Sequence, residues 1–203
     1  MTTDLVICVP VRDTVTSTFA FDLASLVGHI SNKGVSYKLL FQNGSILPDQ
    51  RTQLVKDALK HNPKHIMFLD SDMAFPAIIY EELVKHNKSV VACTYSTRSQ
   101  PYRSVAFLDH NNLSARLNKT SGLHLVASVG MGIMLINAEV FKTVNTPWFV
   151  FEWNNTYDGF IGEDIYFCKK IKEYDYDVFV DASISNLCGH SASVIKRLTD
   201  INA

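Results

Sequence analysis

Residues 65–75 read HIMFLDSDMAF, and this stretch decides the fold. An apolar run of strand length ends directly at Asp70, and Ser71 and Asp72 follow before the chain becomes apolar again. Two carboxylates two positions apart, where a chain leaves a sheet, suit one hard divalent cation such as Mg²⁺ or Mn²⁺. The same tripeptide also suits a solvated turn, because Asp and Ser favour turns. The motif therefore needs support from the rest of the chain.

Upstream and just downstream of this stretch, apolar runs alternate with amphipathic ones over the first 95 residues. Strands are predicted at 4–10, 36–42, 65–70 and 89–95, and helices at 19–32, 49–61 and 76–87. Thr16 or Ser17 is a suitable N-cap for the first helix, and Gly34 ends it. The alternation predicts an α/β fold with a central, mostly parallel sheet flanked by helices. Ligands of such sheets bind outside the carboxyl ends of the strands, so residues 1–95 are predicted to form a nucleotide-binding half.

Residues 96–203 have a different pattern and are predicted to form an acceptor-side half of the same domain, 1–203. Short strand-like runs between 104 and 129, with a turn at Asn111–Asn112, predict a small antiparallel hairpin region. Further strands are expected at 131–136 and 177–182, and helices at 138–144 and 163–174. A chain of 203 residues fits a single domain.

Composition excludes several classes of protein. Hydrophobic residues make up 47% of the chain, and the net charge is −1, so a folded core is expected and a basic nucleic-acid-binding face is not. The four cysteines are scattered, without zinc-site spacing, and are expected to be reduced. The sequence shows neither a signal-peptide pattern nor an apolar run of spanning length. These features predict a cytoplasmic protein that contacts membranes only peripherally.

Further polar residues recur where a ligand site would need them. Arg12 and Asp13 follow the first strand, and Arg51 lies one turn inside the second helix, within reach of a phosphate or a base. Arg98 and Arg103 flank a loop placed to close on a diphosphate. Each is equally compatible with an ordinary solvated side chain. His190 is a candidate metal ligand as a neutral imidazole, although a surface histidine is the simpler interpretation.

Gly162-Glu163-Asp164 precedes an apolar helix and follows an aromatic segment. Capping alone explains carboxylates at a helix N-terminus, and the helix dipole there is expected to lower their pKa, which acts against a general base. The aromatic segment contains Trp148, Trp153, Tyr157 and Phe160, which suit either a rim for a sugar acceptor or buried packing.

Together these segments resemble the GT-A class of nucleotide-sugar-dependent glycosyltransferases. The matching segments, in order, are VPVRD (9–13), RTQLVKDAL (51–59), IMFLDSDMAF (66–75), VGMGIMLINAEVF (129–141), GEDIYFCKKI (162–171) and CGH (188–190). The compact length is similar to that of the small glycosyltransferases of large DNA viruses, such as algal viruses, and of bacteriophages. For a virus-encoded chain, the resemblance implies a location in the host cytoplasm.

The resemblance implies a GT-A (Rossmann-like) fold, a nucleotide-sugar donor with UDP-sugars favoured, a glycan or glycoprotein acceptor, and Mn²⁺ or Mg²⁺ as cofactor. Its implied roles follow the matching positions. Donor and nucleotide contacts fall on Pro10, Val11, Arg12, Asp13, Arg51, Asp70 and Ser71; metal ligands on Asp70, Asp72 and His190; the catalytic pair on Asp164 and Glu163; and acceptor contacts on Trp153 and Tyr157.

Two departures from the family pattern concern the donor and acceptor sides. The second strand ends in Gln42-Asn43-Gly44 instead of an acidic pair, and the loop 98–103 has no clear counterpart.

Two other classes of protein stay open. A haloacid-dehalogenase-type phosphatase would use Asp70 as nucleophile, but two strand–helix units precede the motif here and residue 74 is Ala. A non-catalytic carbohydrate-binding domain would rely on the aromatics at 148–160. Inverting and retaining chemistry both fit the sequence.

Overall fold

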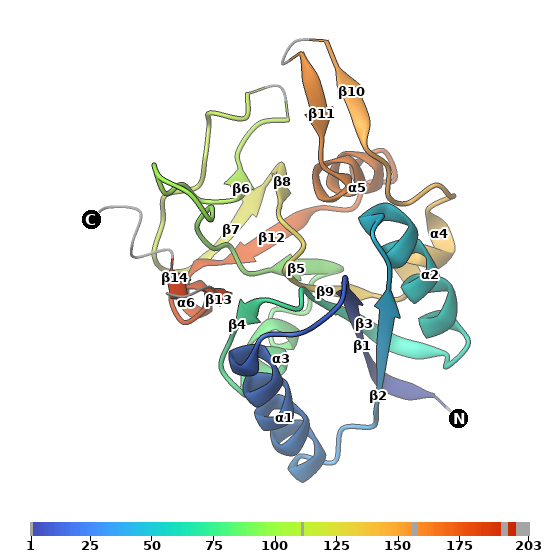
Figure 1. Ribbon diagram of the computed structural model, residues 1–203. Helices are drawn as coiled ribbons and strands as arrows, with labels where there is room; N and C mark the ends of the chain where they lie inside the picture. The colour runs from blue at the N-terminus through green and yellow to red at the C-terminus, as the bar shows by residue number, and fades with distance from the viewer. Residues whose placement is uncertain (1, 111, 156–157, 192–194, 198–203) are drawn as a thin grey trace.

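The computed structural model describes residues 2–110, 112–155, 158–191 and 195–197, and a seven-stranded sheet forms its centre (Figure 1). Its strands are Thr3–Val11 (β1), Tyr37–Asn43 (β2), Pro63–Leu69 (β3), Val90–Ala92 (β5), Leu123–Val126 (β7), Ile133–Asn137 (β9) and Val178–Asp181 (β12). They lie in the order β2–β1–β3–β9–β5–β12–β7. Within the described residues β9 and β7 run against the other five strands. The predicted α/β fold with a mostly parallel sheet is confirmed.

Helices cover both faces of the sheet and make three layers. One face carries Ser17–Asn32 (α1), Ile79–Val84 (α3) and Ala182–Ser185 (α6), and the other carries Leu47–Leu59 (α2), Glu139–Thr143 (α4) and Glu163–Lys172 (α5). Strand β1 shows the division: Leu5, Ile7 and Val9 pack in the layer of α1, whereas Val6 and Cys8 pack in the layer of α2. Burial on both faces explains why its sequence is apolar throughout.

Local signals set the helix ends. The Thr16 hydroxyl accepts a hydrogen bond from the N–H of Phe19 at 3.2 Å and caps α1, and Gly34 follows the helix with φ +74°. Pro48 lies in the first turn of α2, where its missing N–H costs little. Helix α3 is shorter than the predicted 76–87, because the chain forms a turn after Pro76 and takes a positive φ at Asn87.

The antiparallel part of the second half differs from the expectation in its details. Ala106–Phe107 (β6) pairs with Ser128–Val129 (β8), but β7 joins the edge of the main sheet instead of a separate hairpin. Asn111, at the predicted turn, lies outside the described residues. A further hairpin, Glu152–Asn154 (β10) with Gly159–Ile161 (β11), forms in the aromatic segment and projects from the body beside α5 (Figure 1).

A small three-stranded sheet joins residues 189–191 and 195–197 to the turn after β3. Met73–Ala74 (β4) pairs antiparallel with Gly189–Ser191 (β13), and β13 pairs with Ile195–Arg197 (β14). His190 is thereby set opposite Met73, one residue after Asp72. None of the described helices is both long enough and apolar enough to span a bilayer.

Candidate functional site

A pocket of about 290 Å³ opens at the carboxyl ends of β1 and β3. Its lining residues are Pro10, Arg12, Gly44, Ser45, Leu47, Gln50, Asp70, Ser71, Asp72 and Arg98. Six residues singled out from the sequence therefore share one cavity: Pro10, Arg12, Asp70, Ser71, Asp72 and Arg98. The position agrees with the rule that α/β sheets bind ligands beyond the ends of their parallel strands.

Main-chain hydrogen bonds hold the turn Asp70–Asp72 in place. The Asp70 N–H donates to the Gly132 carbonyl at 2.9 Å, and the Asp70 carbonyl accepts from the Met73 N–H at 3.0 Å. The Ser71 carbonyl accepts from the N–H of Thr16, the cap of α1, at 3.2 Å. The turn is thus held from β9, from its own chain and from α1, so its side chains project from a fixed backbone.

Arg51 lies beneath the pocket and joins two carboxylates. Its Nη2 donates to Asp70 Oδ1 at 2.8 Å and its Nε to Glu163 Oε1 at 3.1 Å, while the residue is only 1% exposed. Burial by itself would lower the pKa of Arg51, but the charges of Asp70 and Glu163 outweigh it and raise the pKa. The guanidinium of Arg51 faces two protein carboxylates, and its predicted contact with a donor stays a prediction. It holds Asp70 and α5 together.

Asp164, the residue after Glu163, has a different environment. It is only partly accessible, and burial raises its pKa to about 6, with the Glu163 charge acting in the same direction. The N–H of Ile165 donates to Asp164 Oδ1 at 2.8 Å and acts in the opposite sense. The expectation that the helix dipole dominates and lowers this pKa is therefore wrong, because desolvation and a like charge outweigh it. A carboxylate of this pKa suits proton transfer near neutral pH.

Tyr95 was not identified from the sequence, yet it packs between the acidic groups. It is 5% exposed; burial raises its pKa well above the usual value, and the charges of Asp70 and Asp164 add to that rise. Its hydroxyl accepts the N–H of Gly132 at 2.9 Å. A Cβ at Gly130 or Gly132 would lie 2.7 or 2.5 Å from that hydroxyl oxygen. In the sequence, Gly130 and Gly132 of the segment VGMG are the residues that could have indicated that a side chain packs closely against this backbone.

Gln50 is a second residue that the sequence did not reveal. Its buried amide Nε2 donates to the Val11 carbonyl at 2.7 Å and to the Gln42 carbonyl at 2.6 Å. It therefore ties together the ends of β1 and β2, where the pocket opens. Val11 is 5% exposed, and its contact with this part of the structure is the hydrogen bond that its backbone carbonyl accepts from Gln50.

Asp13 and Trp153 are not among the residues that line the pocket. Asp13 is exposed and lies 3.7 Å from Arg12 Nε. Trp153 is half-exposed on the hairpin β10–β11, opposite Phe160 in register, with ring centroids 5.1 Å apart. Trp148, by contrast, is buried, so the aromatic segment divides between core and surface. Tyr157 lies outside the described residues.

The sequence predicts a divalent-cation site on Asp70, Asp72 and His190, and this assignment stays a prediction. Within the described residues, no group of three or more His, Cys, Asp or Glu side chains stands close enough to hold a metal ion. Arg51 and Arg98 each pair with one of the two aspartates. The chemistry of the set still fits: the Nδ1 of His190 meets the Ser96 carbonyl at 3.1 Å, which leaves Nε2 for a ligand. Burial lowers the pKa of His190, which favours the neutral, ligating imidazole.

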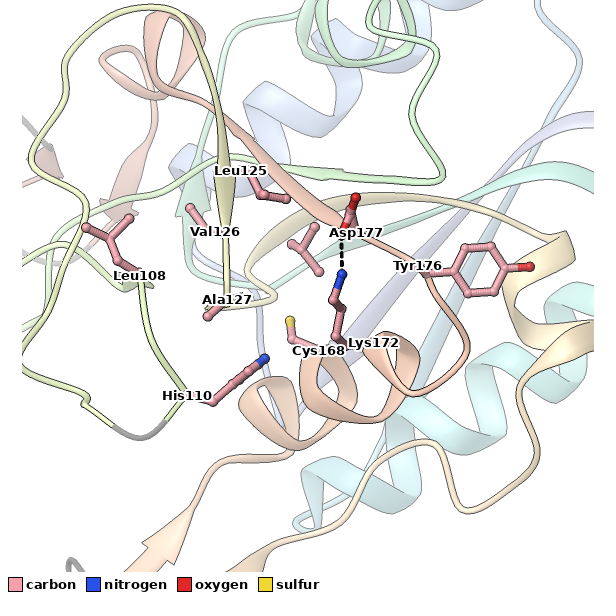
Figure 2. Close-up of a pocket in the computed structure, with 10 residues that line it drawn as sticks. Leu108, His110, Leu125, Val126, Ala127, Cys168, Lys172, Tyr176 and Asp177 are labelled. Atoms are coloured by element: carbon pink, nitrogen blue, oxygen red, sulfur yellow. Dashed lines mark hydrogen bonds and ion pairs between the residues drawn. The ribbon is translucent and has the colours of Figure 1, made fainter.

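A second pocket, of about 250 Å³, lies between α5, β7 and the segment 108–110 (Figure 2). Its lysine, aspartate and tyrosine side chains are paired, its cysteine is a buried thiol, and its other titratable group is His110, whose pKa is lowered by burial. Lys172 is paired with Asp177 at 2.6 Å, and the Tyr176 hydroxyl donates to Thr143. Burial raises the pKa of Cys168 to about 12, so its thiol is not a nucleophile at neutral pH. The pocket at Asp70 is therefore the candidate site.

Comparisons with known proteins bear on the fold. No protein-family model matches the chain, and no curated protein matches it in sequence. Among solved structures, A197 from STIV is similar over 92% of this chain and 85% of its own, with 17% identity and a TM-score of 0.62. A mutant Drosophila β-1,4-galactosyltransferase 7, in complex with manganese, UDP-Gal and xylobiose, is similar over 98% of this chain and 68% of its own, with 16% identity and a TM-score of 0.50. At these identities the likeness shows the fold, which is GT-A-like.

Proposed function

We propose that this protein transfers a sugar from a nucleoside-diphosphate sugar, UDP-sugars being favoured, to a glycan or glycoprotein acceptor, with Mn²⁺ or Mg²⁺ as cofactor. One observation carries the proposal: Asp70, Ser71 and Asp72 share a pocket with Pro10 and Arg12 at the carboxyl ends of β1 and β3, with His190 placed beside them by β13. The galactosyltransferase of similar fold was solved with manganese and UDP-Gal, which supports this choice of ligands.

The donor would occupy the pocket with its nucleotide against Pro10 and Arg12. Arg12 is exposed, so its charge is available to a ribose or phosphate oxygen. The Ser71 hydroxyl lines the same wall, next to Asp70. Asp70 is oriented by Arg51 at 2.8 Å, so its carboxylate meets the donor in a fixed position. Fixed orientation of this kind lowers the entropic cost of reaching the reactive geometry.

Asp70, Asp72 and His190 would hold the cation. When bound, a divalent cation offsets the negative charge that builds on the leaving diphosphate. The Ser96 carbonyl orients His190, and the Ser191 N–H donates to the Asp72 carbonyl at 2.5 Å, so both residues are set by the β4–β13 pairing.

Asp164 would act on the acceptor. With a pKa of about 6 it is largely deprotonated at pH 7 and basic enough to accept the proton of an attacking hydroxyl. Glu163 is 5% exposed and paired with Arg51, so it positions its neighbour. In an inverting reaction Asp164 takes the proton; in a retaining reaction it orients the acceptor. Both remain within the proposal.

Trp153 and, by its place in the sequence, Tyr157 would contact the acceptor. Trp153 lies on the hairpin that leads directly into α5, and its indole Nε1 donates to Asn155 at 3.0 Å. Half-exposed aromatic faces of this kind stack on sugar rings. The cytoplasmic location and the peripheral membrane contact stay predictions.

The test is a thermal-shift screen of UDP-, GDP- and dTDP-sugars with and without Mn²⁺, followed by an assay of donor hydrolysis and transfer. A ligand at 100 times its Kd stabilises the folded state by about 2.7 kcal/mol, which a thermal shift resolves. Asp72→Asn should abolish turnover and leave the fold intact, whereas Asp175→Asn, an exposed position after α5, should change neither. Full activity of Asp72→Asn would contradict the proposal. Sugar affinity without metal and without donor hydrolysis would instead indicate a carbohydrate-binding domain.

A further inference from the structure

Arg98 places a positive charge on the carboxylate that the proposed function assigns to a metal ion. Its Nη2 lies 2.5 Å from Asp72 Oδ2, and both residues line the pocket that contains Asp70. The Arg98 side chain is 67% exposed and that of Asp72 is 27% exposed. The contact is therefore a solvent-facing ion pair at the mouth of the site, unlike the buried pairs of Arg51.

The loop that carries Arg98 is fastened at its base. The Thr97 N–H donates to the Arg103 carbonyl at 2.8 Å, and the Arg103 N–H donates to the Thr97 hydroxyl at 3.1 Å. Ser96 and Ser104 pair just outside these contacts. The backbone of Arg98 is therefore held by the base of the loop, and the rotamer of the Arg98 side chain brings its guanidinium to Asp72. Release of the pair needs a rotamer change and leaves the loop where it is.

The same loop contacts the third candidate ligand. The Ser96 carbonyl, two residues before Arg98, meets His190 Nδ1 at 3.1 Å. Arg98, Asp72 and His190 are therefore neighbours in one small region, fixed by the loop base on one side and by the β4–β13 pairing on the other. A divalent cation on Asp72 would repel a guanidinium at this distance, and because the Arg98 side chain is exposed, unlike that of Arg51, it is free to turn away.

We propose that Arg98 is a counter-ion exchanged during donor binding: it neutralises Asp72 before the metal binds, leaves when the cation takes that carboxylate, and then contacts the diphosphate of the donor. The inference rests on the proposed function and adds a residue and a binding order to it. A guanidinium is suited to both partners, because its planar donors match carboxylate and phosphate oxygens. The charges of Arg12, Arg98, Asp70 and Asp72 cancel before any ligand binds, and the diphosphate offsets the charge that the cation adds.

The exchange predicts effects of opposite sign on two ligands. Arg98→Gln should bind Mn²⁺ roughly 2- to 5-fold more tightly than the wild-type chain, the range expected for loss of an exposed ion pair. With Mn²⁺ saturating, the same variant should bind UDP roughly 5- to 10-fold more weakly, because a charge-assisted phosphate contact is lost. A merely structural role for Arg98 would weaken both ligands together.

The experiment titrates the full-length chain with MnCl₂ at one pH, following free Mn²⁺ by electron paramagnetic resonance, and then titrates UDP by calorimetry. Lys119→Gln is the control: it removes one positive charge at an exposed position outside the pocket lining and should change either Kd by less than about 1.5-fold. Mn²⁺ binding that is equal or weaker in Arg98→Gln, or equal gains in both variants, would overturn the exchange. A wild-type chain that binds no Mn²⁺ would contradict the metal site of the proposed function itself.

Discussion

Replacing Arg51 by methionine removes the one cation shared by Asp70 and Glu163 and leaves both carboxylates in place. The two contacts, 2.8 and 3.1 Å long, each correspond to a Coulomb attraction of about 5–6 kcal/mol at an effective dielectric constant of about 20. Desolvation of the buried guanidinium cancels much of this, and loss of one partner of a buried pair usually costs about 3–5 kcal/mol.

We expect the free energy of unfolding of Arg51→Met to fall by about 3–4 kcal/mol, toward the lower end of that range because the Asp70 side chain keeps 24% exposure and can be hydrated. For a chain of this length the melting temperature should fall by roughly 10 °C. Urea unfolding followed by the fluorescence of the buried Trp148 measures the change. Lys56→Met, an exposed position of the same helix, is the control and should stay within about 0.5 kcal/mol.

The double variant Arg51→Met/Glu163→Gln tests the reason for this loss. Removing the orphaned charge of Glu163 should restore part of the stability, so the double variant should be more stable than the sum of the single effects predicts. A loss below about 1 kcal/mol in Arg51→Met, or strict additivity in the double variant, would refute the view that these contacts are a coupled buried network.

Three further outcomes are expected. The folded-state pKa of Asp164 is raised to about 6 from an ordinary value of 3.8, so the unfolded chain releases this proton at a lower pH than the folded chain does. The group therefore lowers the free energy of unfolding by up to about 3 kcal/mol as pH rises from about 4 to 6. Asp164→Asn should lack that fall in pH-dependent unfolding, and kcat/KM of the wild type should rise through pH 6. Gly132→Ala should destabilise by about 1–3 kcal/mol in thermal unfolding, since its Cβ would lie 2.5 Å from the Tyr95 hydroxyl, whereas Gly28→Ala, with open space in α1, should be neutral or stabilising. Gln50→Leu removes a side-chain donor from the carbonyls of Val11 and Gln42, of which Val11 keeps the N–H of Gly44 at 3.1 Å; the change should cost about 1–2 kcal/mol together with weaker nucleotide affinity, measured by urea unfolding and calorimetry.

Much of the fold could be predicted from periodicity, because strands buried on both faces and helices with capping signals are local patterns. The neighbours of a strand are less visible. Among the strands of the main sheet, β5 is the next one after β3 in the chain. In the sheet, however, β9 lies between them, and it comes from a segment about 40 residues after β5. No local pattern in 89–95 indicates that its partners come from the second half.

The candidate site divides in the same way. Pro10, Arg12, Asp70, Ser71 and Asp72 could be placed together because each lies at or just after the carboxyl end of a predicted parallel strand. The buried role of Arg51 could not, since its partner Glu163 is 112 positions away. The pKa of Asp164 depends on burial, which overrides the local dipole. Arg98 was visible only as a basic loop residue, and its pairing with Asp72 needed the fold.

The position of β9 has a consequence for synthesis of the chain on the ribosome. Strand β5 has β9 and β12 as its neighbours, so residues 90–92 find no partner in the sheet until residues 133–137 have emerged. The backbone that supports Asp70 through the Gly132 carbonyl arrives in the same late segment. A nascent chain of 95 residues would therefore expose an unpaired, apolar strand and lack a finished pocket, and it is at this stage that we expect aggregation to compete with folding.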